Sequence, residues 1–352
     1  MTALKTTIAF GLLLPFANVA HAEGDVFSPP NHSSLSDFDT STLPTESISR
    51  PLMGNGLPHH VEVRLISDHQ SIAPGVEVQL GIWLEQDDEW HTYWKSPGTI
   101  GKPTLIDWSL EIGEGDAVEE LNVAVSDHEY PIPTKFDQSG IVSYGYEDSV
   151  LLVSTVTLPD SLDSDTLFVK ANVEWLVCKE SCIPGNTSVR LPLVIGEATP
   201  SVHAPLFNKV KEQHPSHPLD VKEFAIERVS SVDVVVPDTT FTHAIKLTPT
   251  SDSPLVFDTT KDWPLFTPIA GDWWWINEQR LIKTDDGGLL IQLDCESFEA
   301  EKLPTTDRIG GLIQLQVGEK WVQVETGSTL QMVAKDTAVG KIESPLFSAS
   351  GT

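Results

Sequence analysis

Apolar and polar residues alternate in several short segments of the chain. In the segment 166–177 every second residue from Leu167 to Trp175 is apolar. A period of two predicts a β-strand with one buried face. Pro and Gly interrupt the segments at short intervals, and nothing between residues 55 and 197 has a helical period. The pattern predicts an antiparallel β-sandwich over 55–197. Its clearest strands are HVEVRLIS (60–67), GVEVQLGIWLE (75–85), TLFVKANVEWLV (166–177) and TSVRLPLV (187–194).

The alternation stops after residue 197 and resumes after residue 220. Within 198–220, APLFNKVKEQ predicts a short helix, which the two prolines of HPSHPLD end. Segments such as THAIKLTP and GLIQLQV then predict a second β-sandwich over 221–345. The predicted fold class is therefore all-β, with two immunoglobulin-like β-sandwich domains joined by a short helical linker.

The N-terminus predicts export from the cytoplasm. Lys5 precedes the apolar run IAFGLLLPFANVA, and Ala20-His21-Ala22 forms a cleavage motif, so residues 1–22 are expected to be a signal peptide cleaved after Ala22. Residues 23–54 are rich in Ser, Pro, Asp and Thr and are expected to form a flexible leader. The mature protein is thus expected where disulfides persist.

The charge of the chain excludes one class of partner. The sequence has 22 Lys and Arg against 51 Asp and Glu, a net charge of −29. Such a chain repels nucleic acid, so no nucleic-acid partner is expected.

The candidate chemistry lies in VEWLVCKESCIPG (173–185), where Cys178 and Cys182 are separated by three residues. The strand at 166–177 precedes the pair and Pro184-Gly185 signals a turn, so the cysteines are expected at the tip of a β-hairpin. In the chain-entropy model a bridge closing such a short loop stabilises by only roughly 2 kcal/mol, against ~4.7 for a hundred-residue loop. The spacing alone leaves three alternatives open: a redox-active pair, a structural disulfide and part of a metal site.

Other residues do not decide between these alternatives. Lys179 favours a thiolate, whereas Glu174 and Glu180 disfavour one. No set of further metal ligands is evident beside the pair. The third cysteine, Cys295, lies in the strand-like LLIQLDCESF and is expected to be a buried free thiol.

Three motifs in order carry a resemblance to a known family. WLVCKESCIPG, followed by a strand, resembles the active-site hairpin of the N-terminal periplasmic domain of DsbD-type thiol:disulfide interchange proteins. It is most similar to the ScsB branch, named for suppression of copper sensitivity. WHTYWKSPGTIGKPTLIDW (90–108), and YPIPTKF with SYGYEDSVLL (within 130–152), also fit that branch. The resemblance covers residues 59–195 and continues more weakly to about 345.

The resemblance implies a periplasmic thiol–disulfide exchange module, a component of a protein-disulfide reductase that needs no cofactor. A membrane-embedded thiol reductase domain or protein would donate electrons, and a periplasmic thioredoxin-like protein would accept them. The ScsB branch continues into a multi-helix membrane domain, so the donor is expected either in a continuation of the chain or in a separate protein.

The resemblance also assigns residues. It makes Cys178 and Cys182 the redox pair, with Cys182 as the attacking thiol and Cys178 as the resolving one. It places a shielding cap within 134–146. Rings expected to shield or line the site are Phe136, Tyr144, Tyr146, Tyr93 and Trp94. Two alternatives are a copper- or other metal-binding module that uses the same cysteines, and a structural adhesion-like sandwich with a fixed disulfide.

Overall fold

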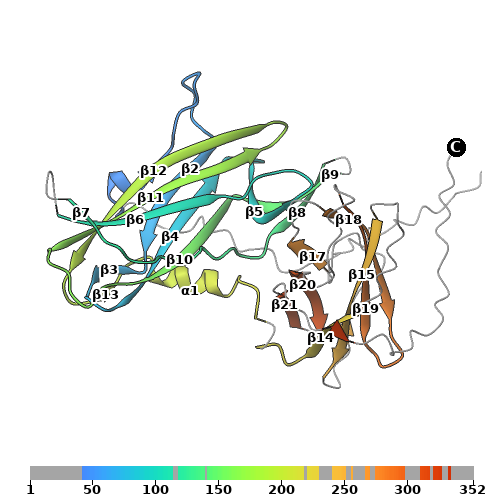
Figure 1. Cartoon of the computed structure of the whole chain (residues 1–352). Coiled ribbons are helices and arrows are strands. Elements are labelled where there is room, and N and C mark those ends of the chain that lie inside the picture. Colours follow the sequence, from blue (N-terminus) through green and yellow to red (C-terminus); the bar gives the residue numbers. More distant parts are fainter. Residues whose placement is uncertain are drawn as a thin grey trace, which may run out of the picture.

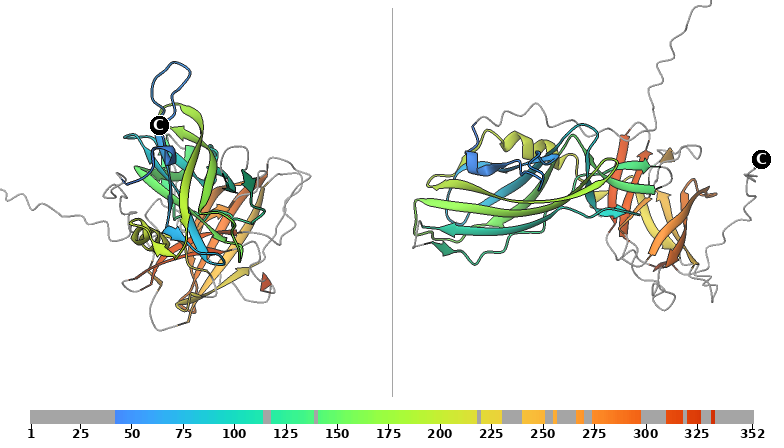
Figure 2. Two further views of the ribbon diagram at one scale, coloured as in Figure 1. Left: turned by 90° about the vertical axis from the view of Figure 1, so that its left-hand side faces the viewer. Right: turned by 90° about the horizontal axis from the view of Figure 1, so that it is seen from above.

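The computed structural model describes residues 42–113, 118–138, 141–217, 220–229, 240–250, 255–256, 266–269, 274–297, 310–317, 320–326 and 332–333. These residues form two β-sandwiches that lie end to end, with one α-helix against the first (Figures 1 and 2). The predicted all-β class is confirmed. The predicted signal peptide, residues 1–22, lies outside the described residues. Within the described part, no helix has the length and apolarity that crossing a bilayer requires.

The first sandwich contains two sheets. One has the strand order β1-β2-β4-β10. The other runs β13-β3-β12-β11-β5-β9-β8, with β6 beside β11 and β7 beside β6. The bounds are β1 (Ile48–Ser49), β2 (Val61–Ser67), β3 (His69–Ile72), β4 (Glu77–Gln86), β5 (His91–Gly98), β6 (Leu105–Ile112), β7 (Glu119–Glu120), β8 (Thr134–Gln138), β9 (Ile141–Glu147), β10 (Ser149–Thr157), β11 (Thr166–Cys178), β12 (Cys182–Ile195) and β13 (Thr199–Pro200).

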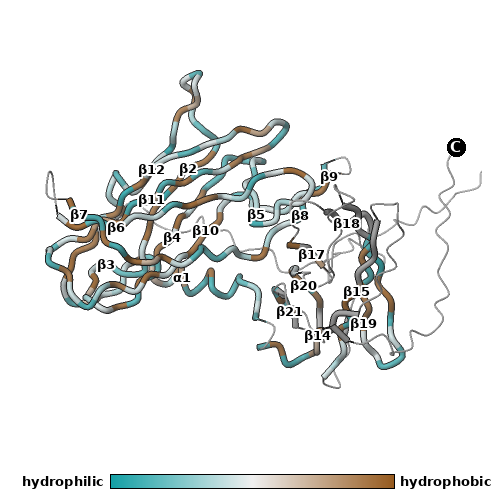
Figure 3. Tube along the Cα trace, viewed as in Figure 1, coloured by the Kyte–Doolittle hydropathy of each residue, from teal (hydrophilic) through white to brown (hydrophobic). Residues whose placement is uncertain are grey.

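The alternating pattern of the sequence builds the core between these sheets. Every second residue of β2 and β11, such as Val63, Leu65, Val169 and Val173, is fully buried in one cluster. Their neighbours in the sequence face outward, and apolar and polar residues are accordingly mixed along the strands (Figure 3). Burial of each such side chain contributes roughly 1.5–3 kcal/mol relative to exposure.

The helix α1 (Ala204–Lys211) covers the outer face of the smaller sheet and falls within the predicted 198–220 segment. Its buried residues Leu206, Phe207 and Val210 pack against Ile66, Trp83, Leu151 and Val153. A Cβ built on Gly81 of β4 would lie 3.2 Å from a ring carbon of Phe207 and 2.7 Å from Leu151, so glycine makes this close approach possible. Strand β4 is therefore buried on both faces at its centre, where a single buried face was predicted.

Part of the predicted leader, residues 23–54, packs on the first sandwich. The 3-10 helix η1 (Thr45–Ser47) buries Ser47, and β1 pairs with β2 through Ile48 and Ser49. Residues 23–41 of that segment lie outside the described part of the chain. The first sandwich thus begins before residue 55.

The second sandwich also contains two sheets. Their orders are β18-β19-β15-β14-β22, and β16-β20-β17 with β21 beside β20. Residues of both sheets share one core, among them Phe266, Ile291 and Ile313. The bounds are β14 (Phe224–Val229), β15 (Thr240–Pro249), β16 (Leu255–Val256), β17 (Phe266–Ile269), β18 (Trp274–Lys283), β19 (Leu289–Ser297), β20 (Gly310–Val317), β21 (Lys320–Thr326) and β22 (Met332–Val333).

The two sandwiches touch beside strand β5. Lys95 of β5 forms an ion pair with Glu325 of β21. Leu312 of β20 belongs to the core cluster of the first sandwich. Ser216, after α1, forms a parallel bridge with Val324. Strand β5, which borders the cysteine pair, is thus fastened to the second sandwich as well as to its own sheet.

Truncation of Phe207 tests the docking of α1. We expect Phe207→Ala to lower the free energy of unfolding by about 3–5 kcal/mol, because it removes a buried ring and leaves a cavity. Urea denaturation measures the change. Asn208→Ala, an exposed position on the same helix, should change it by less than about 0.5 kcal/mol. Equal effects of the two substitutions would contradict the packing described.

Candidate functional site

Cys178 and Cys182 close the tip of the β11–β12 hairpin. The strands pair antiparallel from Thr166↔Val194 to Cys178↔Cys182, so the cysteines are direct cross-strand partners around the turn Lys179–Ser181. A disulfide joins them, with an S–S length of 2.00 Å and a Cα–Cα distance of 4.1 Å. The predicted position at a hairpin tip is confirmed, but the predicted turn is wrong: Pro184 and Gly185 lie within β12 and pair with Leu176 and Trp175.

The two cysteines differ in exposure. Cys178 is only 3% exposed, whereas Cys182 is an exposed residue. A disulfide is cleaved by attack of a thiolate on one of its sulfurs, so access decides which sulfur is attacked. An incoming thiolate can reach Cys182, and Cys178 is then the sulfur that leaves.

The pairing partner of β11 changes just before the tip. Strand β6 pairs with β11 from Leu167 to Glu174. Strand β5 then takes over, and its first residue, His91, is the Cα partner of Cys178. The exchange brings His91 and Tyr93 of β5 beside the cysteines.

Tyr93 is the aromatic residue of β5 that reaches the disulfide. Its hydroxyl lies 3.8 Å from Cys182 Sγ, and its side chain is 1% exposed. Burial raises the pKa of Tyr93, so the phenol stays protonated. Gly101 lies against the ring: a Cβ there would come within 2.4 Å of two ring carbons.

Strands β8 (Thr134–Gln138) and β9 (Ile141–Glu147) pair antiparallel and cover this site; we refer to them as the cap hairpin. Phe136 of β8 stacks on the His91 ring, with centroids 4.4 Å apart and planes at 21°. Gln138 Nε2 donates a hydrogen bond of 3.3 Å to the Lys179 carbonyl in the cysteine turn. Through Phe136 and Gln138, β8 of the cap hairpin contacts the site, while β9 is paired by its backbone with β5, from His91↔Glu147 to Gly98↔Ser143.

The other three predicted rings occupy packing positions. Trp94 is 1% exposed in the core, with the Lys95 ammonium 5.6 Å above its ring. Tyr146 is 5% exposed and donates a hydrogen bond of 2.6 Å to the Pro131 carbonyl. Burial raises the pKa of Tyr146 well above its ordinary value. Tyr144 is half-buried against the same core. The structure thus places Tyr93 and His91 beside the cysteines, and Phe136 on the far side of the His91 ring.

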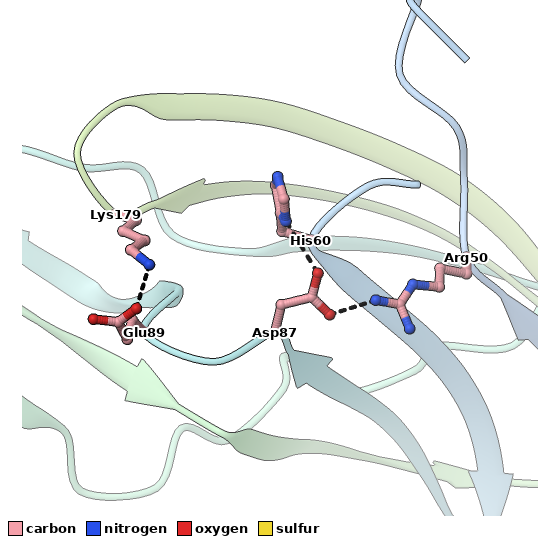
Figure 4. A network of polar contacts seen from close by, with 5 residues as sticks. All are labelled: Arg50, His60, Asp87, Glu89 and Lys179. Carbon is pink, nitrogen blue, oxygen red and sulfur yellow. Dashed lines mark hydrogen bonds and ion pairs between the residues drawn. The ribbon is translucent and has the colours of Figure 1, made fainter. Parts of the chain in front are cut away.

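The turn between β4 and β5 anchors the cysteine turn from outside (Figure 4). Glu89 in that turn forms an ion pair with Lys179. Asp87, in the same turn, pairs with Arg50 and lies 3.0 Å from His60 Nδ1. The bond to Glu89 raises the pKa of Lys179. Lys179 was expected to favour a thiolate, but its charge is offset by Glu89.

Trp175 and Gly185 fix the register of the hairpin near its tip. They are cross-strand partners. A Cβ at position 185 would lie 2.4 Å from the Trp175 ring, so only glycine leaves room for the indole. His59 completes the packing: its ring meets the Trp175 ring edge-on at 5.2 Å, and its Nε2 lies 3.3 Å from the Pro184 carbonyl.

Sequence reasoning missed His91, Glu89 and Gln138. His91 precedes Tyr93 by two residues, so strand alternation places both side chains on one face, a signal present in WHTYW. Nothing in the sequence marks Glu89 or Gln138, because their partners lie far along the chain. Among the described residues, no group of three or more His, Cys, Asp or Glu is placed to hold a metal ion. The side chain of Cys295 lies outside the described part; its backbone pairs with Phe241 and Ile276.

Comparisons with known proteins agree with the geometry. Residues 62–193 match the family described as thiol:disulfide interchange protein DsbD, N-terminal. No match was found among curated proteins. The fold is similar to the crystal structure of the N-terminal periplasmic domain of ScsB from Proteus mirabilis, with a TM-score of 0.54 and 17% sequence identity. That similarity covers 81% of this chain and 99% of the other, so it extends beyond the first sandwich.

Removal of the Phe136 ring tests the cap hairpin. An aromatic pair contributes about 0.5–1.5 kcal/mol beyond its buried area. We therefore expect Phe136→Ala to populate an open cap and to speed alkylation of the reduced cysteines about two- to tenfold. Mass spectrometry of the cysteine peptide measures the rate separately from Cys295.

The matched control is Ile141→Ala, an exposed residue of the same hairpin. It should alkylate at the parent rate. If Phe136→Ala also alkylates at that rate while remaining folded, the ring does not shield the pair.

Proposed function

We propose that the protein is a periplasmic carrier of reducing equivalents, because residues 62–193 match the family of DsbD N-terminal domains and the fold is similar to that of the ScsB N-terminal periplasmic domain. It accepts two electrons from a membrane-embedded thiol reductase domain or protein and passes them to a thioredoxin-like periplasmic protein. The carrier group is the Cys178–Cys182 pair, and no cofactor takes part.

One observation supports this proposal most directly: the disulfide presents one accessible and one buried sulfur at a capped hairpin tip. A purely structural bridge gains little from such a short loop. An exchange protein needs this asymmetry, because a partner must reach one sulfur while the other stays available inside the protein.

The chemistry proceeds in two exchanges. In the reduced protein, the Cys182 thiolate attacks one sulfur of an oxidised partner, and the partner's second sulfur leaves with the electron pair of the broken bond. The Cys178 thiolate then attacks Cys182 Sγ, which forms the disulfide seen in the structure and releases the reduced partner. The donor returns the pair to the dithiol by the reverse sequence.

The cap hairpin suits this cycle. A dithiol in an oxidising compartment is exposed to general oxidants, and Phe136 and Tyr93 close the space around it. Strand β8 lies at the edge of the sheet and contacts the site through the Phe136 ring and the Gln138 amide, whereas β9 is held by its pairing with β5. A docking partner that displaces these two side-chain contacts, and leaves β9 in place, does so at a cost of order 1–3 kcal/mol.

The two alternative functions, a metal-binding module and an adhesion-like protein, can each be tested. A Cu(I)-binding module predicts tight, stoichiometric Cu(I) binding in anaerobic titration, lost when both cysteines are replaced. An adhesion-like protein with a fixed bridge predicts a disulfide that resists mild reductants.

Single-cysteine variants test the exchange roles. We expect Cys178→Ala, in a Cys295→Ala background, to accumulate a mixed disulfide with an oxidised thioredoxin-fold disulfide isomerase, because no internal thiol can resolve it. Cys182→Ala in the same background should accumulate at least about tenfold less, because its remaining thiol is buried. Non-reducing gel electrophoresis followed by mass spectrometry measures both. A folded Cys178→Ala variant that traps nothing, or equal trapping by the two variants, would contradict the proposal.

A further inference from the structure

Four side chains form a row across neighbouring strands at the site. Glu147 of β9 is the Cα partner of His91, His91 is the partner of Cys178, and Cys178 is the partner of Cys182. Directly paired residues of antiparallel strands project to the same face, with Cβ atoms about 4.5–5.5 Å apart. His91 therefore flanks the buried cysteine on the side opposite Cys182.

The imidazole of His91 is held in place by rings. It is 4% exposed, stacks on Phe136 at 4.4 Å and meets the Tyr93 ring edge-on at 5.2 Å. No hydrogen bond of this imidazole is found among the described residues. Burial lowers the pKa of His91, so the ring is neutral at neutral pH, which is the form that accepts a proton.

The other titratable groups around the row are poorly suited to accept a proton from Cys178. Tyr93 is a protonated phenol whose pKa burial raises. Glu147 pairs with His91 and not with a cysteine, and burial raises its pKa. In the turn, Lys179 and Glu89 neutralise each other. Of the described groups facing Cys178, His91 is the one whose ordinary pKa lies nearest neutrality.

The buried cysteine, Cys178, needs a proton acceptor beside it. Only the thiolate is nucleophilic, and burial in apolar surroundings raises a thiol pKa above its ordinary value of about 8.5. Cys178 is 3% exposed, so at neutral pH it would carry little thiolate without a neighbouring base. Cys–His pairs overcome this difficulty in cysteine enzymes.

We propose that His91 is the general base that activates Cys178 in the resolving step. This proposal rests on the proposed exchange function. In the mixed disulfide, His91 takes the proton from Cys178 Sγ–H, and the resulting thiolate attacks Cys182 Sγ. The bond between Cys182 and the partner breaks, and the partner's sulfur leaves with the electron pair. The imidazolium then passes its proton to the leaving thiolate or to water. In the reverse direction, imidazolium protonates Cys178 as it leaves.

The resolving step can be isolated with a small aromatic disulfide, dipyridyl disulfide, at one equivalent per reduced protein. In a Cys295→Ala background the first pyridinethione appears when Cys182 attacks, and the second appears when Cys178 resolves. Stopped-flow absorbance gives both rates across a range of pH. A small disulfide reports on this step even if the protein exchanges with no thioredoxin-like partner, so the two proposals fail separately.

His91→Phe keeps the ring contacts but cannot accept a proton. As the pH is raised, we expect the resolving rate of the parent to reach its plateau below pH 7, because the lowered pKa of His91 leaves this base already deprotonated there. In His91→Phe the rate should be about ten- to a hundredfold lower at pH 7. As the pH is raised further, the resolving rate of His91→Phe should rise about tenfold per pH unit until the Cys178 thiol itself ionises, near or above pH 8.5. The first, Cys182-dependent rate should change less than about threefold.

His91→Gln is the second variant and should show the same pH profile. His128→Phe, which replaces a histidine bonded to Tyr130 outside the row, should keep the parent profile. If the resolving rates of His91→Phe and His91→Gln superimpose on the parent at every pH, His91 is not the base. A uniform loss of rate with an unchanged profile would also overturn the proposal, since it would indicate a packing role.

Discussion

The register of the β11–β12 hairpin is the constraint on which the site depends. Side chains alternate along a strand, so a slip of one residue would turn one cysteine to the other face and forbid the disulfide. Trp175 lying over Gly185 fixes that register, because no larger residue leaves room for the indole. With the register set, Cys178 falls beside Cys182 on one strand and beside His91 on the other.

Burial then gives two chemically identical cysteines different roles. Cys182 reaches solvent, while Cys178 is enclosed by β5 and the cap hairpin. The enclosing elements are themselves fastened at several points. Glu89 holds the cysteine turn, and Lys95 ties β5 to the second sandwich through Glu325. The second sandwich thus supports the strand that carries His91 and Tyr93, a structural contribution that its sequence did not suggest.

Much of the fold followed from local pattern, and the less predictable parts depended on long-range contacts. Period-two alternation predicted β2, β4 and β11, whereas Pro184-Gly185, interpreted as a turn, lies inside β12. The cysteine spacing with its flanking strand predicted the hairpin tip, and the resemblance supplied Tyr93 and Phe136. The burial of both faces of β4 was missed because α1, far along the chain, covers its outer side. Glu89 and Gln138 were missed for the same reason. Tyr146 resembled a shielding ring, yet alternation along β9 turns it into the core.

The proposed function requires that the Cys178–Cys182 disulfide be made and broken repeatedly. The reduction potential of this disulfide decides whether that is so. The protein, in a Cys295→Ala background, would be equilibrated in graded thiol buffers, and alkylated cysteines would be counted by mass. A potential between about −180 and −270 mV, the range of exchange proteins, is the predicted result. A potential below about −300 mV would mark a structural bond and contradict the account.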